Sequence, residues 1–285
     1  MGEYAGVDFG SSLTKFAWYK DDKLCFATPN YKRKLDLIVS EMITDGVKSA
    51  IATGINDHDR AALAPIQIFD QILGDQIQNE IELQARGARK LLEIEGKTLD
   101  SFLVVSIGTG TSYTFVRDEK IERFPFGHAL GAGFIDGVLT MASIGRGSAD
   151  DPNLTAFGPY RAEIMDTLIE DVSKKMKGTF VGSLPIAHFG KMDGGGMRDA
   201  IVTAINCTAT AVVRDIAMFA MMPEWLPPKD VVFLGTITER SSALREILEH
   251  KFVSLGQNFP NWNHQLIFPR NATYAGALGA LEFGK

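Results

Sequence analysis

The sequence has little of what marks an exported or disulfide-stabilised protein. Its 285 residues include only two cysteines, Cys25 and Cys207, which lie far apart in unrelated apolar surroundings. This usage is typical of buried thiols in a reducing compartment. The opening residues MGEYAGV have neither the basic flank nor the apolar stretch of a secretory signal. We therefore expect a cytoplasmic protein.

The sequence also lacks long apolar runs and an excess of positive charge. Its most apolar segment, residues 200–222, is interrupted near the middle by Arg214 and Asp215, which predicts a buried core or interface helix and not a membrane span. The net charge of −6 argues against a broad surface for nucleic acid or for an anionic membrane. Any bound phosphate must then be held by local features of the chain.

Common metal and nucleotide motifs are missing as well. The five histidines have no ligand spacing with one another or with cysteine, so no zinc site is predicted. Gly96-Lys97-Thr98 looks like the end of a Walker A motif, but Leu91 stands where that motif requires glycine. The dinucleotide fingerprint fails at Gly108-Thr109-Gly110 because Tyr113 takes the place of the third glycine. Two frequent nucleotide sites are thereby excluded.

What the sequence does have is a globular composition and a pattern that occurs twice. With 45% hydrophobic residues in a chain of this length, one large or two modest domains are expected. Strands are expected at 6–10, 13–18 and 24–28 in the first copy of the pattern, and at 102–107, 112–117 and 120–123 in the second. Further strands are expected at 49–53, 231–234 and 265–268, and helices at 35–44, 76–92, 131–141, 162–175, 198–222, 242–252 and from 272.

The duplication bears directly on the fold. Each copy opens with a hairpin whose tip consists of glycine and hydroxyl residues, and internal repeats of this kind are a fold-level signal. One such hairpin would mean little, but two with matching tips are stronger evidence. They suggest a two-lobed clamp in which the hairpins face each other across a cleft.

The two tips are candidates for holding a triphosphate. Backbone N–H groups can approach phosphate only where side chains are small. The tip residues are Gly10, Ser11 and Ser12 in the first hairpin and Gly108, Thr109, Gly110 and Thr111 in the second. Asp8 would hold the water shell of Mg²⁺, and Lys15 would place a point charge against the transferred phosphate. The alternative is that both tips are ordinary turns, in which glycine and serine are common.

Three further glycine segments extend the pattern. Gly131 and Gly133 precede a helix, and a glycine-rich approach to a helix N-terminus favours an anion. Gly235 ends a strand, where a small residue lets a flat base pass close to the backbone. The small residues of 275–280 predict a helix that packs closely against another.

These segments resemble one family in the same order. Residues 6–15 (GVDFGSSLTK) resemble the first phosphate motif of type II pantothenate kinases, and residues 106–112 (SIGTGTS) resemble the second very closely. Residues 131–134, 182–190 and 270–280 are similar to later segments of that family. The resemblance implies an α/β fold, the two-domain actin-like ATPase (ribonuclease H-like) fold with duplicated βββαβα lobes. The lobes would cover residues 1–98 and 99–285.

The resemblance also implies catalytic residues. In that family a glutamate at the head of a helix is the general base, with an acidic residue two places on and a glycine seven places on. Glu80, Glu82 and Gly87 reproduce this spacing, and two carboxylates close together would raise the pKa of one of them. Otherwise the two glutamates are solvated positions on a charged helix. Arg123 is the candidate for the family's substrate-holding arginine, although it stands one residue further from Gly133 than the pattern predicts.

The implied function is phosphoryl transfer from ATP, with Mg²⁺, to the primary hydroxyl of pantothenate or pantetheine by a homodimer. Some residues depart from the family pattern: Ala132 replaces a glycine, and Pro185 stands where a hydroxyl residue often lines the pantothenate site. These departures do not weaken the prediction of an ATP site, but they leave the identity of the phosphoryl acceptor open. The alternatives are a kinase of the same fold that acts on an amino sugar, and a nucleotide-binding regulator without turnover.

Overall fold

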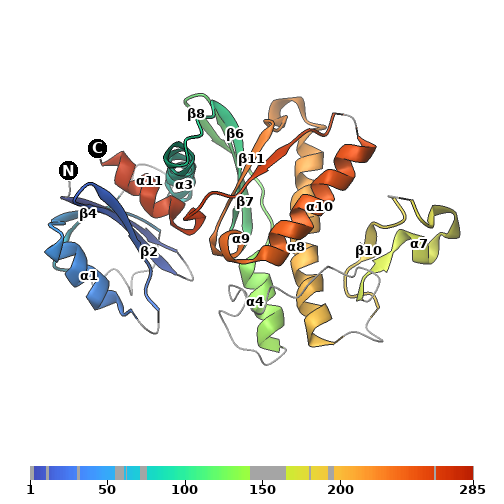
Figure 1. Ribbon diagram of the computed structural model, residues 1–285, viewed down its shortest axis with the longest axis horizontal. Coiled ribbons are helices and arrows are strands. Elements are labelled where there is room, and N and C mark those ends of the chain that lie inside the picture. Colours follow the sequence, from blue (N-terminus) through green and yellow to red (C-terminus); the bar gives the residue numbers. More distant parts are fainter. Residues whose placement is uncertain are drawn as a thin grey trace.

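The fold is described by a computed structural model, which covers residues 3–10, 13–30, 33–54, 61, 63–70, 76–141, 165–179, 181–191, 196–259 and 261–284. Two five-stranded sheets stand side by side along the longest axis, and helices lie between them and over the outer face of the second sheet (Figure 1).

The first sheet has the strand order β3-β2-β1-β4-β5. Its strands are β1 (Tyr4–Phe9), β2 (Thr14–Lys20), β3 (Lys23–Ala27), β4 (Ser49–Gly54) and β5 (Gln67–Asp70). The first three form an antiparallel meander, and β4 and β5 run parallel to β1. Helix α1 (Leu35–Thr44) connects β3 to β4 and buries Ile38, Val39 and Met42 against this lobe.

The second sheet repeats the first. Its order is β12-β11-β6-β7-β8, in which an antiparallel meander is again followed outward by two parallel strands. The strands are β6 (Ser101–Ile107), β7 (Thr111–Arg117), β8 (Lys120–Arg123), β11 (Asp230–Leu234) and β12 (Gln265–Ile267). Two sheets with this shared topology make the actin-like ATPase fold, and the predicted duplication of βββαβα lobes is confirmed.

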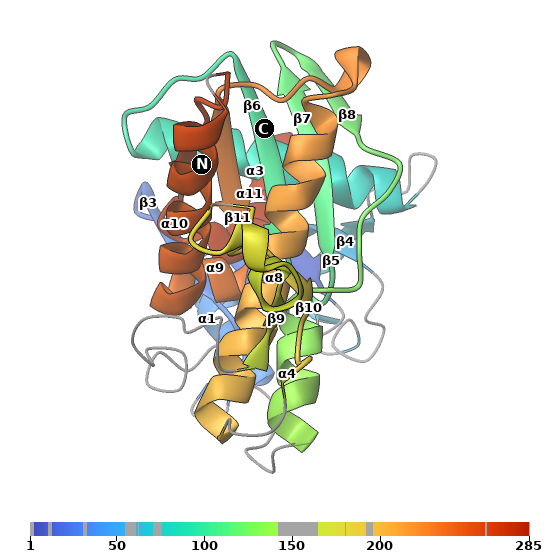
Figure 2. The same cartoon turned by 90° about the vertical axis from the view of Figure 1, so that its right-hand side faces the viewer.

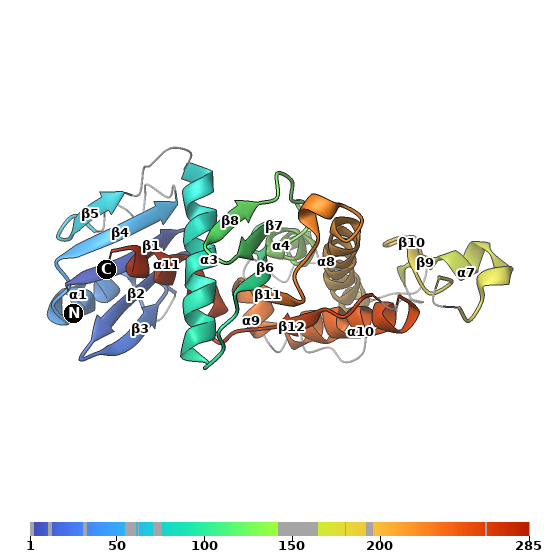
Figure 3. The ribbon, with the colours of Figure 1, turned by 90° about the horizontal axis from the view of Figure 1, so that it is seen from above.

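Two helices lie between the sheets. These are α3 (Gln76–Ile94) and α11 (Ala275–Phe283), which follow the last strand of the first and second sheet respectively (Figure 3). Both contribute to one apolar cluster with strands of the second sheet, and α11 also packs on β1. Each lobe therefore ends in a helix that is shared by both.

Glycine makes this shared layer possible. A Cβ atom at Gly87 of α3 would lie 1.8 Å from the carbonyl oxygen of Ala275, and one at Gly279 of α11 would lie 1.8 Å from that of Leu83. At Gly6 of β1 the corresponding distance to the oxygen of Ala277 is also 1.8 Å. No side chain fits at such distances, so the close packing predicted for residues 275–280 is confirmed.

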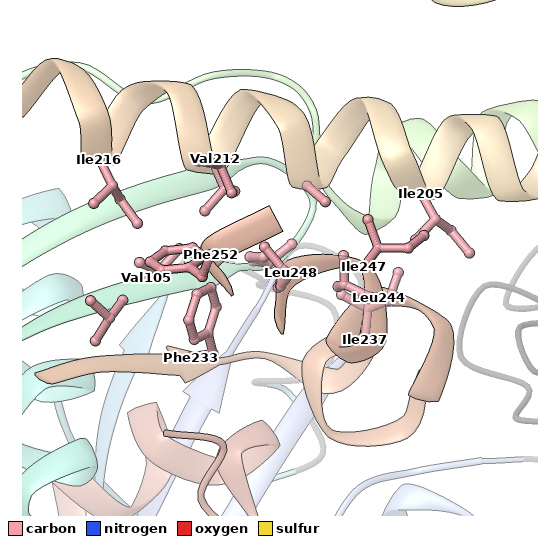
Figure 4. Close-up of a cluster of buried hydrophobic side chains, with 14 of the residues drawn as sticks. Val105, Ile205, Val212, Ile216, Phe233, Ile237, Leu244, Ile247, Leu248 and Phe252 are labelled. Carbon is pink, nitrogen blue, oxygen red and sulfur yellow. The ribbon is translucent and has the colours of Figure 1, made fainter. Parts of the chain in front are cut away.

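The outer face of the second sheet carries the largest core. Helices α8 (Met197–Phe219) and α10 (Ser242–Asn258) cover it, and α4 (Ala132–Met141) and α9 (Thr236–Arg240) pack beside them. Figure 4 shows Ile205, Val212 and Ile216 of α8 above Phe233 and the α10 residues Leu244, Leu248 and Phe252. Helix α8 is long and apolar enough to cross a membrane, but it is mostly buried here, as predicted for a core helix.

A small unit lies beyond α8 and α10 at the right-hand end of Figure 1 and faces the viewer in Figure 2. It contains β9 (Thr167–Leu168), α7 (Ile169–Val172), the 3₁₀ helix η2 (Lys174–Met176) and β10 (Pro185–Ala187), which pairs with β9. The single helix predicted at 162–175 is therefore wrong over its described part, residues 165–175. The reason is non-local, because buried Asp166 accepts hydrogen bonds from the Phe189 amide and the Asn206 side chain.

The other predicted elements have the right type, with ends that differ by a few residues. Among the elements that were not predicted are β5 in the first sheet and α9 in the second lobe. In addition, α10 extends to Asn258, and a 3₁₀ turn η4 (Ala272–Tyr274) precedes α11. Cys25 and Cys207 are both free thiols, on β3 and α8, and both are half-buried. The division of the chain at residues 98 and 99 stays a prediction.

Candidate active site

The two hairpin tips open into one cleft. This cleft is lined by Asp8, Gly10 and Lys15 from the first hairpin and by Gly108 and Thr109 from the second. The rest of the lining comes from the two hairpins, α3, α4, the end of β11 with α9, and the residues at the start of α11: Leu13, Ser106, Ile107, Glu80, Gln84, Ala132, Gly133, Asp136, Leu234, Gly235, Thr236, Ile237, Ala272, Thr273, Ala275 and Gly276. The predicted clamp, with both hairpins facing a shared crevice, is confirmed.

Asp8 and Lys15 form a buried pair at the mouth of the first hairpin. They are opposite each other in the β1–β2 register, so their side chains emerge on one face of the sheet. Lys15 Nζ lies 3.3 Å from Asp8 Oδ2, and the Asp8 side chain is only 5% exposed. A Cβ atom at Gly276 would lie 2.8 Å from the same oxygen, so α11 leaves room for this carboxylate by having glycine there.

The other carboxylate oxygen of Asp8, Oδ1, is relevant to the predicted Mg²⁺ site. Asp8 Oδ1 is buried and has no hydrogen-bond partner among the described residues. Within the same residues, no group of three histidine, cysteine or acidic side chains could hold a metal ion. Mg²⁺ keeps several waters and binds proteins through one or two carboxylates together with substrate phosphates. Asp8 therefore fits Mg²⁺ held chiefly by water and phosphate.

Glu80 faces the cleft from the first described turns of α3. Burial raises the pKa of its carboxyl above the ordinary value, and the negative charge of Asp8 raises it further. The positive charges of Lys15 and Arg123 act in the opposite direction. Gln84, one helical turn later, donates from Nε2 to Glu80 Oε1 over 3.2 Å. Glu80 thus has the burial and the charged neighbours that tune a general base.

Glu82 does not share this environment. Its Oε1 lies 2.7 Å from Nη2 of Arg86 in an exposed i,i+4 pair. Residues two places apart project from different faces of a helix, so Glu82 is turned away from Glu80. The carboxylate that raises the pKa of Glu80 is Asp8, and the expectation that Glu82 does so is wrong. Glu82 is therefore a solvated position on a charged helix, whereas Glu80 is not.

Arg123 ends β8 close to this group. Its charge is near enough to lower the pKa of Glu80, and its Nε is buried without a hydrogen-bond partner among the described residues. Arg123 stands one residue further from Gly133 than the family pattern predicts, but it still lies near Glu80. Its contact with a substrate stays a prediction.

The tip of the second hairpin is held by the loop that leads to α4. Gly108 N donates to Gly110 O, and a Cβ atom at Gly110 would lie 2.8 Å from the carbonyl oxygen of His128. Thr111 donates from its amide to His128 O and from its hydroxyl to Leu130 O. Gly108 and Thr109 line the cleft, whereas Gly110 and Thr111 lie behind them.

Gly131 and Gly133 let this loop approach the tip. A Cβ atom at Gly131 would lie 2.6 Å from Gly108 O, and one at Gly133 would lie 2.8 Å from Thr109 O. The first amides of α4 already have partners, since Ala132 N donates to Gly108 O and Gly133 N to Thr109 O. Of the two glycines, Gly133 lines the cleft. A direct phosphate contact from either stays a prediction.

No protein-family model matches the chain. The type II pantothenate kinase of Staphylococcus epidermidis is 24% identical over 280 residues, which are 97% of this chain and 98% of the relative. That of Staphylococcus aureus is 24% identical over 294 residues, covering 98% of this chain and 99% of the relative. That of Bacillus cereus is 23% identical over 290 residues, covering 99% and 98%. This chain resembles type II pantothenate kinases from end to end.

A ROK family glucokinase from Streptomyces griseus, solved with glucose and AMPPNP, matches with a TM-score of 0.48 and 15% identity over 98% of both chains. A glucokinase from Balamuthia mandrillaris, solved with glucose, matches with a TM-score of 0.49 and 15% identity, covering 98% of this chain and 93% of that one.

The backbone conformation at position 235 also requires glycine. Its φ of 112° is rarely adopted by other residues, and a Cβ atom there would lie 2.1 Å from Ile107 O. Gly235 lines the cleft, and its contact with a base stays a prediction. Ser11 and Ser12, also predicted as phosphate contacts, lie outside the described residues.

His128, which precedes Gly131, is turned into the protein. Its Nδ1 accepts a hydrogen bond from Leu130 N, and its Nε2 lies 3.2 Å from the Tyr113 hydroxyl. Tyr113 donates in turn to Asp215 of α8 over 2.9 Å. His128 therefore fastens the loop behind the second tip. Burial is the main cause that lowers its pKa.

Sequence reasoning missed several residues of the cleft. Gln84 could have been found, since it follows the predicted base by four residues and so lies on the same helix face. Asp136 on α4 and Thr273 before α11 gave no signal, because their place depends on how distant elements pack.

Proposed function

We propose that this protein is an ATP-dependent kinase that transfers the γ-phosphoryl group to the primary hydroxyl of pantothenate, the first step of coenzyme A biosynthesis, or of the related alcohol pantetheine. The observation that carries the proposal is the shared cleft: hairpin tips from both lobes line it together with Asp8, Lys15 and the buried Glu80. The end-to-end resemblance to type II pantothenate kinases supports the acceptor.

The cleft has a place for each part of the nucleotide. The tips at Gly10 and Gly108 would hold the phosphates through backbone amides, and Gly235 would allow the base to lie against the backbone. Lys15 would place its charge beside the phosphates. Bound Mg²⁺, held at Asp8 through water, would neutralise negative charge on the β- and γ-phosphates.

Glu80 would serve as the general base. As the oxygen of the acceptor hydroxyl forms its bond to the γ-phosphorus, the hydroxyl proton passes to the Glu80 carboxylate. The bond between the γ-phosphorus and the bridging oxygen breaks, and ADP leaves with that oxygen. Gln84 orients the carboxylate through Oε1, and Arg123 would hold the acceptor beside it.

The remaining features of the proposal follow from the resemblance. The protein would be a cytoplasmic homodimer, as we expect for a bacterial-type metabolic kinase. Its partners would be small molecules, without nucleic acid or membrane.

The deciding experiment measures ADP formation with MgATP and a panel of acceptors, namely pantothenate, pantetheine and a hexosamine, beside ATP affinity by calorimetry. We expect transfer to pantothenate or pantetheine. Transfer to the hexosamine alone would assign the protein to the amino-sugar kinases of this fold. Tight ATP binding without transfer to any acceptor would identify a nucleotide-binding regulator.

A further inference from the structure

One carboxylate joins two parts of the cleft wall. Glu239 lies on α9, directly after the cleft residues Thr236 and Ile237. Its Oε1 accepts a hydrogen bond from Asn271 N over 3.2 Å. Its Oε2 accepts two more, from Thr273 N over 3.1 Å and from the Thr273 hydroxyl over 2.7 Å. Thr273 is itself buried and lines the cleft beside α9.

The segment that Glu239 holds is a crossing between the lobes. Residues 271–276 lead from β12, in the second sheet, to α11, which packs on β1 of the first. Asn271 bends the chain at the start of this segment with a left-handed φ of 60°. At the end, Gly276 lies against the Asp8 carboxylate.

The crossing is fastened to the first lobe as well. Tyr274 stacks on Phe26 of β3 with 4.9 Å between ring centroids. The crossing segment is therefore held to the first lobe through Tyr274 and Gly276, and its hydrogen bonds to the second lobe include those to Glu239.

We propose, on the basis of the proposed function, that Glu239 is a positioning residue for the nucleotide. By fixing residues 271–273 to α9, it sets how the two adjoining parts of the cleft wall, Gly235–Ile237 and Ala272–Gly276, lie relative to each other. The same fixation keeps Gly276 in place beside Asp8, so the base end and the phosphate end of the cleft are aligned with each other. Glu239 would act on ATP without contacting the acceptor.

The chemistry of the contact explains why a carboxylate is needed. Two backbone amides and one hydroxyl all donate, so the residue at 239 must only accept. Glutamine has the same size, but one of its two terminal atoms is an NH₂ group, which cannot accept. Glu239→Gln would therefore set a donor against a donor at one of the two positions.

The test compares three variants for nucleotide binding and kinetics. Glu239→Gln removes part of the contact, Thr273→Val removes only the hydroxyl donor, and Glu249→Gln makes the matched change at an exposed position of α10. The dissociation constant of MgADP is measured by calorimetry, and KM is measured separately for ATP and for the acceptor. Folding is checked by circular dichroism and thermal melting.

We expect Glu239→Gln to weaken MgADP binding and to raise KM for ATP about tenfold, with KM for the acceptor within twofold of the wild-type value. Thr273→Val should weaken nucleotide binding about threefold, and the double variant should be no weaker than Glu239→Gln alone because both changes remove one contact. Glu249→Gln should match the wild type.

The outcomes separate this inference from the proposed function. If the wild-type protein binds no MgADP, the proposed function fails. If the wild type binds MgADP and Glu239→Gln binds it equally well, the positioning role is refuted while the kinase proposal stands. If Glu239→Gln does not fold, Thr273→Val decides, and unchanged nucleotide affinity in that variant would refute the role. An equal rise of both KM values would also contradict it.

Discussion

At the scale of single residues, burial and nearby charges distinguish Glu80 from Glu82 as the candidate base. The spacing of Glu80 to Gly87 singled out the glutamate that is buried beside Asp8 and Lys15, and its role as the base stays a prediction. The spacing could not show that Glu82 points away, because that depends on which face of α3 meets the cleft.

The first prediction concerns catalysis. Glu80→Gln should lower kcat by about 10²–10⁴-fold, because the amide cannot take the acceptor proton, and it should leave ATP affinity nearly unchanged. Steady-state kinetics and calorimetry check both parts. The matched control is Glu82→Gln, which removes an exposed carboxylate two residues away and should retain wild-type kcat. An active Glu80→Gln variant would mean that another carboxylate is the base.

The second prediction concerns stability and pH. Burial raises the pKa of Glu80 in the folded protein, so the folded state holds this proton more tightly than the unfolded state. Below the pKa that Glu80 has in the unfolded state, the carboxyl is protonated in both states and leaves the free energy of unfolding unchanged. As the pH rises from there toward the pKa in the folded state, the carboxyl lowers the free energy of unfolding increasingly. Glu80→Gln should therefore raise Tm at pH 8, by about 2 °C for each kcal/mol of relieved cost, and have no effect at pH 3. Melting curves across this range test the prediction, and an equal gain at both pH values would contradict it.

At the scale of elements, periodicity and turn residues predicted the two meanders and helix α1 with little error. These elements depend on local patterns, namely alternation around small turns and an apolar helix face. The helix predicted at 162–175 failed because the partners of Asp166 come from Phe189 and Asn206, far along the chain. A local pattern has no access to such contacts.

The third prediction concerns the contact between α3 and α11. Gly279→Ala should lower the free energy of unfolding by about 1–3 kcal/mol or more, because the new methyl group meets the Leu83 carbonyl. The matched control is Gly137→Ala in α4, where a Cβ atom would meet nothing within 4 Å. That change should stabilise the protein by about 0.5–1 kcal/mol. Urea denaturation measures both, and equal effects would show that α3 and α11 are not in close contact.

At the scale of the whole molecule, the duplication was visible in the sequence as two hairpins with matching tips, and the sheets repeat one strand order. The shared layer of α3 and α11 was not visible, because nothing local distinguishes a helix that covers its own lobe from one inserted between two lobes. Glu239 could not be found from the sequence for the same reason, because its hydrogen bonds depend on residues 271–273 packing against α9.

The fourth prediction uses the fact that both lobes line the cleft. MgATP at 100 times its dissociation constant should stabilise the fold by about 2.7 kcal/mol, which raises Tm by about 5 °C. In Asp8→Asn this gain should no longer depend on Mg²⁺, while ATP without metal should bind as before. Thermal melts with ATP in the presence of Mg²⁺ or of EDTA make the comparison. An Asp8→Asn protein that still responds to Mg²⁺ would place the metal elsewhere.

The position of α11 has a consequence for how the chain is made. This helix follows all the strands of both sheets in the sequence, yet it covers β1, which is synthesised before the rest of both sheets. The face of β1 that α11 covers must therefore stay uncovered until both sheets have been synthesised. During that time the nascent first lobe exposes a surface on which chaperones can act, and its maturation can finish only after the second sheet has been synthesised.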